Sequence, residues 1–228
     1  MDAGAPTTRA GGGGRAAGDG LGEVVALRPE NAALRARVEE LAPIVLLCAP
    51  GEHRMSRNEP VAELDARYGS ADEPTGWAEA LRRLEEAEVY WVVTVRSEGG
   101  PHVTPLFGVV VDGALYFFTG PAEQKARNLA ANPRCALLTG CNVIDGLDVV
   151  AEGEAVRVTN EATLRGVADA VATKYADGAG LGDDWRFAVR DGAFAGPGGN
   201  EAHLFELVPS RGYGFGRGKV FSHTRFRF

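Results

Sequence analysis

The chain has 228 residues, of which 45% are hydrophobic and 24% are charged. This length and composition are typical of one globular domain, with or without an extension. The formal net charge of −7 argues against a protein that coats nucleic-acid phosphates, since no basic cluster offsets it. No apolar run approaches the roughly 20 residues that a membrane-spanning helix needs. Three cysteines without a secretory signal indicate a cytoplasmic location, and we expect neither a nucleic acid nor a membrane as partner.

Residues 1–54 differ in composition from the rest of the chain. Residues 1–22 contain eight glycines and no aromatic residue, so this segment cannot bury enough apolar surface to offset the entropy lost on ordering. We expect a disordered extension over 1–54, a linker over 55–76 and one folded domain over 77–228. Two explanations of the extension stay open: it is a native tail, or the protein begins at Met55 in the cell.

From Trp77 onward, helix and strand patterns follow one another. Trp77–Glu88 has apolar residues near helical spacing and is predicted to be a helix. Val89–Arg96 is rich in β-branched and aromatic residues, which is typical of a strand, and the glycines after it indicate a turn. A second strand is expected over Pro101–Val111. It must be bulged, bent or at an edge at Pro105, because proline has no N–H to donate.

The remaining elements continue this order. Asp112-Gly113 predicts a tight hairpin into a strand at Ala114–Phe118. Pro121 suits the first position of a helix that ends near Ala131. Asn160 is expected to cap a later helix with an apolar face. Further strands are expected at Cys135–Gly140, Leu147–Thr159, His203–Val208 and within Val220–Phe228. Strands outnumber helices, so we predict a mainly β fold: a closed or nearly closed antiparallel barrel with peripheral helices.

Three segments, GGPHVTPL, DGALYFFTG and KARNLAANPRCALLTG, follow one another between residues 99 and 140. Their order and spacing resemble the flavin-binding split-barrel family, that of the pyridoxamine 5′-phosphate oxidases and the related deazaflavin-dependent reductases. The resemblance covers roughly residues 77–228. It implies a split β-barrel and a homodimer with a cofactor at each of two interface sites. The implied cofactor is FMN or the deazaflavin coenzyme F420.

The resemblance also implies which residues hold the cofactor. Lys125 matches the family's phosphate-binding lysine, and free N–H groups near a helix start would assist it. Other cofactor contacts would come from Val103, Thr104, Pro105, Leu106, Thr119, Gly120 and Asn128. Candidate substrate-binding residues are Tyr213, His223 and Arg225, and the proton donor could be Tyr213, His223 or solvent. No catalytic residue is assigned, and no metal site is expected, because no histidines and cysteines stand at metal-ligand spacing.

Departures from the family pattern narrow the expected activity. Where true pyridoxamine phosphate oxidases have Ser-Arg-Lys, this chain has Glu123-Gln124-Lys125, and the arginines expected on the second strand and near the C-terminus are absent. We therefore expect a flavin- or deazaflavin-dependent oxidoreductase that transfers hydride to a small organic acceptor other than pyridoxamine phosphate. The alternative is a non-catalytic carrier of flavin or haem on the same barrel, with His102 or His223 as the axial haem ligand.

Two smaller patterns complete the prediction. Cys135 and Cys141 are six residues apart and are expected to be buried structural thiols. Glycines alternate with Tyr213 and Phe215 near the end of the chain. That alternation predicts a strand against which aromatic side chains or a cofactor pack closely.

Overall fold

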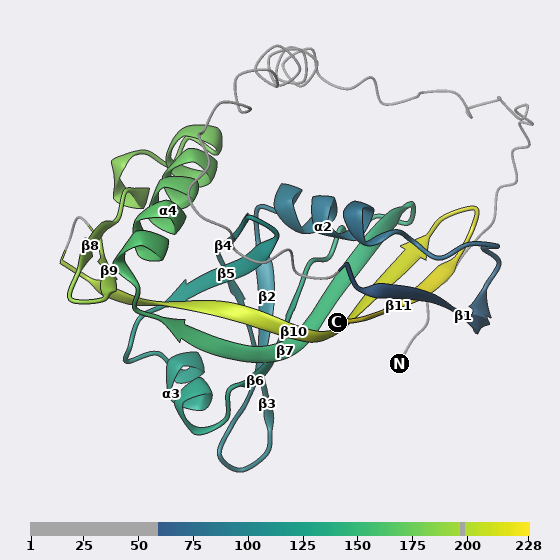
Figure 1. The fold of residues 1–228 in the computed structure, drawn as a ribbon, viewed down its shortest axis with the longest axis horizontal. Helices are drawn as coiled ribbons and strands as arrows, with labels where there is room; N and C mark the ends of the chain where they lie inside the picture. The colour runs from purple at the N-terminus through teal and green to yellow at the C-terminus, as the bar shows by residue number, and fades with distance from the viewer. Residues whose placement is uncertain (1–58, 197–198) are drawn as a thin grey trace, which may run out of the picture. The chain divides into compact units, whose positions relative to one another are not determined.

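The computed structural model describes residues 59–196 and 199–228, which belong to a compact unit spanning Arg57–Phe228. The expected extension over 1–54 and the alternative start at Met55 lie outside the described residues. The main feature of the unit is an eleven-stranded antiparallel sheet with helices at its periphery (Figure 1). The predicted mainly β fold, a split barrel with peripheral helices, is confirmed.

The first hairpin joins β2 (Tyr90–Val95) to β3 (Pro101–Leu106), with Gly99 at a φ of +87° in the turn. Within the described residues β3 pairs only with β2, so it is an edge strand, as Pro105 predicts. The single strand expected over 101–111 is instead two strands. The chain breaks after Leu106 and continues as β4 (Gly108–Val111), which pairs with a different neighbour.

That neighbour is β5 (Ala114–Thr119), reached through the predicted Asp112-Gly113 turn. Both turn residues have positive φ, +50° and +72°, as a type I′ hairpin requires. Gly108 lets β4 approach β5 closely, because a Cβ at that position would lie 2.7 Å from the carbonyl oxygen of Tyr116. At the break at residue 107, the chain therefore changes its pairing partner: β3 pairs with β2, whereas β4 pairs with β5.

The centre of the sheet is β10 (Glu201–Arg217), a strand of 17 residues. It pairs along its length with β7 (Gly146–Val158). Its other edge is shared: its first part pairs with β5 and its last part with β11 (Ser222–Arg227). Because β10 changes its partner from β5 to β11 along its length, the sheet divides at this point, which gives a split barrel. Beyond β7 lies β6 (Arg134–Leu138), which pairs with β2.

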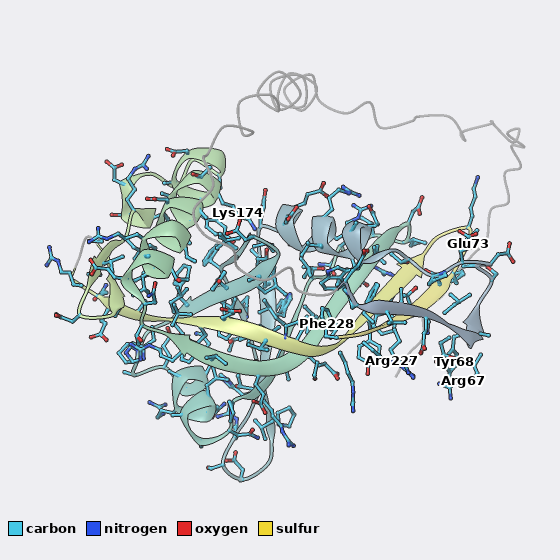
Figure 2. The ribbon with its side chains drawn as sticks, viewed as in Figure 1. Arg67, Tyr68, Glu73, Lys174, Arg227 and Phe228 are labelled. Atoms are coloured by element: carbon cyan, nitrogen blue, oxygen red, sulfur yellow. The ribbon has the colours of Figure 1, made fainter. Side chains whose placement is uncertain are left out.

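Three of the strands were not anticipated, namely β1, β8 and β9. Residues expected to be part of a linker form β1 (Val61–Gly69), which pairs with β11 at the sheet edge. Arg67 and Tyr68 lie toward the outer end of β1, and Arg227, which pairs with Val61 at the start of β1, lies nearer the middle of the view (Figure 2). A short hairpin, β8 (Ala188–Arg190) and β9 (Ala193–Ala195), adds to the start of β10.

In the part of the chain that the structure describes, three α-helices lie around the barrel: α2 (Trp77–Glu86), α3 (Gln124–Ala131) and α4 (Glu161–Val171). A π-helical turn, η1 (Ala172–Gly178), continues α4, and a 3₁₀ turn, η2 (Asp183–Trp185), follows. As predicted, Asn160 caps α4, and its side chain accepts a hydrogen bond from the Thr163 N–H at 3.0 Å. Helix α3 begins three residues later than expected from Pro121, because Gly120–Glu123 forms a turn closed by the Glu123 N–H.

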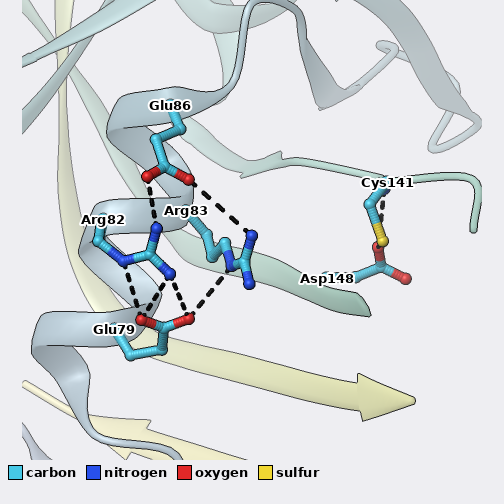
Figure 3. A network of polar contacts seen from close by, with 6 residues as sticks. All are labelled: Glu79, Arg82, Arg83, Glu86, Cys141 and Asp148. Carbon is cyan, nitrogen blue, oxygen red and sulfur yellow. Dashed lines mark hydrogen bonds and ion pairs between the residues drawn. The ribbon is translucent and has the colours of Figure 1, made fainter. Parts of the chain in front are cut away.

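The exposed face of α2 carries Arg82 and Arg83 between Glu79 and Glu86 (Figure 3). Exposed pairs of this kind contribute little to stability. The same view shows Cys141, whose thiol lies 3.2 Å from an Asp148 carboxylate oxygen. Cys135 is buried, but Cys141 is exposed. The expectation of a buried thiol is wrong for Cys141, because β6 ends at Leu138 and Cys141 lies in the loop that follows.

Two apolar clusters hold the fold together. One fills the barrel interior and includes Tyr90, Leu137, Phe205 and Phe226. The other lies between α4 with η1 and the outer side of β4, β5 and β10. The face predicted for the α4 helix is buried there, namely Leu164, Val167, Ala168, Val171 and Tyr175. The outer side of β2, β3 and β6 retains exposed apolar side chains, among them Trp91 at 42% and Val103 at 52% exposure.

Candidate functional site

A pocket of about 470 Å³ opens where β3 and β5 end, beside the start of α3 and of β10. Ligand sites in proteins typically have volumes of roughly 300–1,000 Å³. Its walls are mainly apolar, and its polar side chains come from Thr119, Glu123, Lys125, Asn200 and Glu201. The apolar lining consists of Val89, Pro105, Leu106, Phe107, Phe118, Phe187 and Ala202.

Lys125 is the buried cation of this pocket, with only 10% of its side chain exposed. Its ammonium group donates a hydrogen bond to the carboxylate of Glu123. The other carboxylate oxygen of Glu123 accepts the Gly120 N–H at 2.8 Å. Burial works to raise the pKa of Glu123, but the hydrogen bonds from Lys125 and from the Gly120 N–H outweigh it and hold the pKa below its usual range. The carboxylate is therefore ionised at neutral pH.

Asn128 lies one helical turn beyond Lys125 and is buried. Its side chain donates to the Thr94 hydroxyl at 2.8 Å and accepts from Gln124 at 2.7 Å. These bonds fasten α3 to β2, so Asn128 positions the helix that presents Lys125. It does not line the pocket.

The structure brings five of the eight predicted cofactor-binding residues to this pocket: Pro105, Leu106, Thr119, Gly120 and Lys125. Val103 is exposed on the edge strand instead. The hydroxyl oxygen of Thr104 is shielded from water and has no hydrogen-bond partner among the described residues. Thr104 is adjacent in sequence to two pocket residues but does not itself line the pocket.

The chemistry of the pocket fits a flat aromatic ring with a polar tail. Phe107, Phe118 and Phe187 supply aromatic and apolar contact area, and Lys125 can attract an anionic group. The fit has one exception. The place on Lys125 where an anionic tail would bind already holds the carboxylate of Glu123.

The candidate substrate residues Tyr213, His223 and Arg225 do not lie at this pocket. A row of register partners crosses β3, β2, β6, β7 and β10 in that order: Pro105, Trp91, Leu138, Val150 and Tyr213. Measured along the sheet, four strand spacings separate Pro105 from Tyr213, or roughly 19 Å.

Tyr213 and His223 belong to an aromatic group of their own. Tyr213 stacks on Phe215 at 6.0 Å between ring centroids, and His223 lies between Phe215 and Tyr68 at 5.2 and 5.3 Å. On the opposite face, the Phe226 ring packs over Gly212 and Gly214, where a Cβ would lie 3.3 and 3.5 Å from it. The predicted close packing of aromatic side chains on this strand is confirmed.

Several lining residues were missed from the sequence. Phe107 and Phe118 adjoin the motifs, but nothing in their spacing marks them as pocket residues. Phe187, Asn200 and Glu201 come from a segment more than sixty residues after Lys125, and only the pairing of β9 with β10 brings them to the site. Glu123 did have a sequence signal, since it is a carboxylate where the family has a different residue type.

The three histidines of the described residues lie outside the pocket. His102 on β3 has its pKa lowered by burial, with the charges of Arg96 and Lys125 acting in the same direction. His203 contacts Glu201 at 2.8 Å, yet its ring does not line the pocket. Across residues 59–196 and 199–228, no three histidine, cysteine or acidic side chains converge as metal ligands would. The same residues contain no helix long and apolar enough to cross a membrane.

Comparison with solved structures finds similar folds. A conserved hypothetical protein from Mycobacterium tuberculosis has 23% identity and a TM-score of 0.51, over 65% of this chain and 89% of the other. A heme binding protein from Mycobacterium smegmatis has 20% identity and a TM-score of 0.47, over 67% and 59%. A NimC/NimA family protein from Clostridium acetobutylicum has 16% identity and a TM-score of 0.45, over 64% and 90%. At these identities, similarity concerns the fold alone.

Comparison with curated proteins gives no match. The family model for pyridoxamine 5′-phosphate oxidase matches residues 77–214, which is more than half of the chain. This region contains β2 to β9, all three α-helices and most of β10. The chain therefore belongs to the pyridoxamine 5′-phosphate oxidase-like split-barrel family.

Proposed function

We propose that this protein is an oxidoreductase that binds FMN or the deazaflavin F420 in the pocket between β3, β5 and α3. The observation that carries the proposal is the combination of an aromatic and apolar pocket of about 470 Å³ with a buried lysine at the start of a helix. The cofactor would supply the hydride transfer, and the chain would bind it, orient it and exclude water.

The residues that would hold the cofactor have distinct tasks. Pro105, Leu106 and Phe107 follow one another at the end of β3 and offer apolar contact to a ring. Lys125 and the N–H groups at the start of α3 would attract a phosphate. Asn128 would keep that helix in register with β2 through its bond to Thr94. The acceptor would be a small organic molecule, since the pocket has room for little beyond the cofactor.

Flavin is favoured over haem by the composition of the pocket. Haem iron is held in proteins by histidine, cysteine, methionine or tyrosine. None of these residue types is among the described residues that line the pocket. His102 and His223, the candidate axial ligands, lie elsewhere in the fold.

A homodimer is part of the proposal. The outer side of β2, β3 and β6 carries exposed apolar side chains that no helix covers among the described residues. This face reaches the pocket at Pro105 and continues to Tyr213. A second copy packed on it would bury these side chains and lie next to the cofactor.

The first test is a binding titration of the purified full chain with FMN, F420 and haem, followed by fluorescence and absorbance. Binding of FMN or F420, together with consumption of a reductant in the presence of an acceptor, supports the oxidoreductase. Binding without turnover would make the protein a carrier. Binding of haem alone would overturn the proposal.

A further inference from the structure

Glu123 holds the position that an anionic ligand group would take on Lys125. One of its carboxylate oxygens accepts from Lys125 and the other from the Gly120 N–H. These two donors, a buried ammonium group and a backbone N–H next to a helix start, are the kind that bind phosphate oxygens. The protein thus supplies its own anion to the site.

We infer that Glu123 is a specificity-determining residue, which competes with the ligand's tail for Lys125 and favours a singly charged phosphodiester over a doubly charged phosphomonoester. This inference rests on the proposed function, since it concerns the tail of a cofactor bound in that pocket. It goes further by naming the charge of the tail.

The two partners differ in their freedom to move. The Lys125 side chain is 10% exposed, whereas that of Glu123 is 50% exposed. A ligand tail that binds Lys125 would therefore displace Glu123 toward solvent and leave Lys125 in place. Displacement does not remove the carboxylate from the site, because the backbone of Glu123 precedes α3 directly and keeps its side chain beside the start of that helix.

The charge balance then depends on the tail. A phosphomonoester carries about −1.5 to −2 charges at pH 7, whereas a phosphodiester carries one. Counting Lys125, Glu123 and the tail, a dianion leaves an excess of two negative charges and a monoanion leaves one, and the carboxylate of Glu201, which also lines the pocket, adds one negative charge in either case. Repulsion by Glu123 scales with the charge of the tail, so the carboxylate weakens binding of a monoester more than of a diester.

The test compares ligands on the full chain and on Glu123→Gln, which keeps an oxygen for the Gly120 N–H but removes the charge. FMN carries a phosphomonoester, the methyl ester of FMN carries a phosphodiester on the same ring, and riboflavin has no phosphate. We expect Glu123→Gln to bind FMN about tenfold more tightly and the FMN methyl ester about threefold more tightly, by the ratio of tail charges, with riboflavin unchanged. The matched control is Glu161→Gln, a glutamate at the start of α4 that pairs with Arg165 away from the pocket.

Comparing each ligand with itself cancels differences between the rings. Equal tightening of FMN and its methyl ester, or tightening of neither, would overturn the inference while leaving cofactor binding intact. If no flavin binds to any variant, the proposed function fails. Methyl phosphate, a monoester, and dimethyl phosphate, a diester, then still test whether Glu123 competes with a phosphate for Lys125. Thermal unfolding should show that methyl phosphate stabilises Glu123→Gln more than the original chain, and that a second change, Lys125→Met, abolishes the gain. No difference between the two chains would reject the role of Glu123.

Discussion

The ammonium nitrogen of Lys174 lies 3.1 Å from the hydroxyl oxygen of Tyr90 and 3.3 Å from the carbonyl oxygen of Gly108. It also lies 4.9 and 5.4 Å from the centres of the Tyr90 and Tyr175 rings. Figure 2 shows Lys174 between α4 and α2. This one side chain thus fastens the π-helical turn η1 to β2 and to the start of β4, next to the wall of the pocket.

The burial of Lys174 predicts a pH dependence of stability. Burial lowers the pKa of Lys174 to about 8 from 10.5, while the charges of Glu85 and Glu88 act in the opposite direction. The folded state therefore binds this proton less tightly than the unfolded chain does. The resulting cost is fully present below pH 8 and disappears as the pH rises from 8 toward 10.5.

Urea unfolding at pH 7 and pH 9.5 checks this dependence. Between pH 7 and pH 9.5, the free energy of unfolding of the original chain should rise by about 1–2 kcal/mol more than that of Lys174→Met. This value is reduced to allow for the partial exposure of Lys174. Burial raises the pKa of Tyr175 to about 12 and also raises that of Tyr90, so neither tyrosine ionises within this range. Lys219→Met, at an exposed position, is the control and should follow the original chain. Parallel curves for the original chain and Lys174→Met would refute the assignment.

A second prediction concerns the contact between β7 and β10. A Cβ on Gly153 would lie 2.0 Å from the carbonyl oxygen of Val208, at the bulge where the β7–β10 register shifts. The Cβ is fixed to the backbone of β7 and the carbonyl belongs to the backbone of β10, so the clash can be relieved only by shifting a strand. Gly153→Ala should therefore cost about 3 kcal/mol of stability. Gly214→Ala is the matched change on β10, where a Cβ would make ordinary contacts at 3.5 Å. Comparable urea midpoints for the two variants would show that the close approach at Gly153 is unimportant.

Much of the barrel could be predicted because its signals are local. β-Branched and aromatic residues marked β2, Asp112-Gly113 marked the hairpin into β5 with two positive φ values, and Asn160 marked a helix start. The β1 strand was missed because its stability comes from pairing with β11, about 160 residues away. The β8–β9 hairpin was missed for the same reason, since it depends on adding to the edge of β10.

The candidate site was predictable in part. Pro105, Thr119 and Lys125 belong to contiguous motifs, and the pocket contains all three. Phe187 and Glu201 reach the pocket only through the tertiary fold, which no local pattern encodes. The internal pairing of Glu123 with Lys125 depends on where the turn at Gly120 ends and α3 begins, a boundary that the sequence placed three residues too early.

A third prediction tests the role of Lys125. If Lys125 binds the phosphate of the cofactor, Lys125→Ala should weaken FMN or F420 binding by roughly 1.5–3 kcal/mol, the value of a charge-assisted hydrogen bond. The fold should survive, because the Asn128–Thr94 bond and Leu129 still hold α3 on the barrel. Fluorescence titration measures the affinity and circular dichroism checks the fold. Lys219→Ala, an exposed lysine, is the control, and an unchanged affinity in Lys125→Ala would remove Lys125 from the site.

The last prediction concerns assembly. Trp91 is 42% exposed on the outer side of β2, next to Pro105 on one neighbouring strand and Leu138 on the other. Burying so large an apolar side chain against a second copy would contribute roughly 1.5–3 kcal/mol. A carboxylate there would instead lose hydration without a partner.

We therefore expect light scattering to give a dimer mass for the original chain and a monomer mass for Trp91→Glu, with weaker cofactor binding in the monomer. Ile144→Glu makes the same kind of change at an 83% exposed loop position and should leave the dimer intact. A monomeric original chain that binds cofactor tightly would show that the site is complete within one copy.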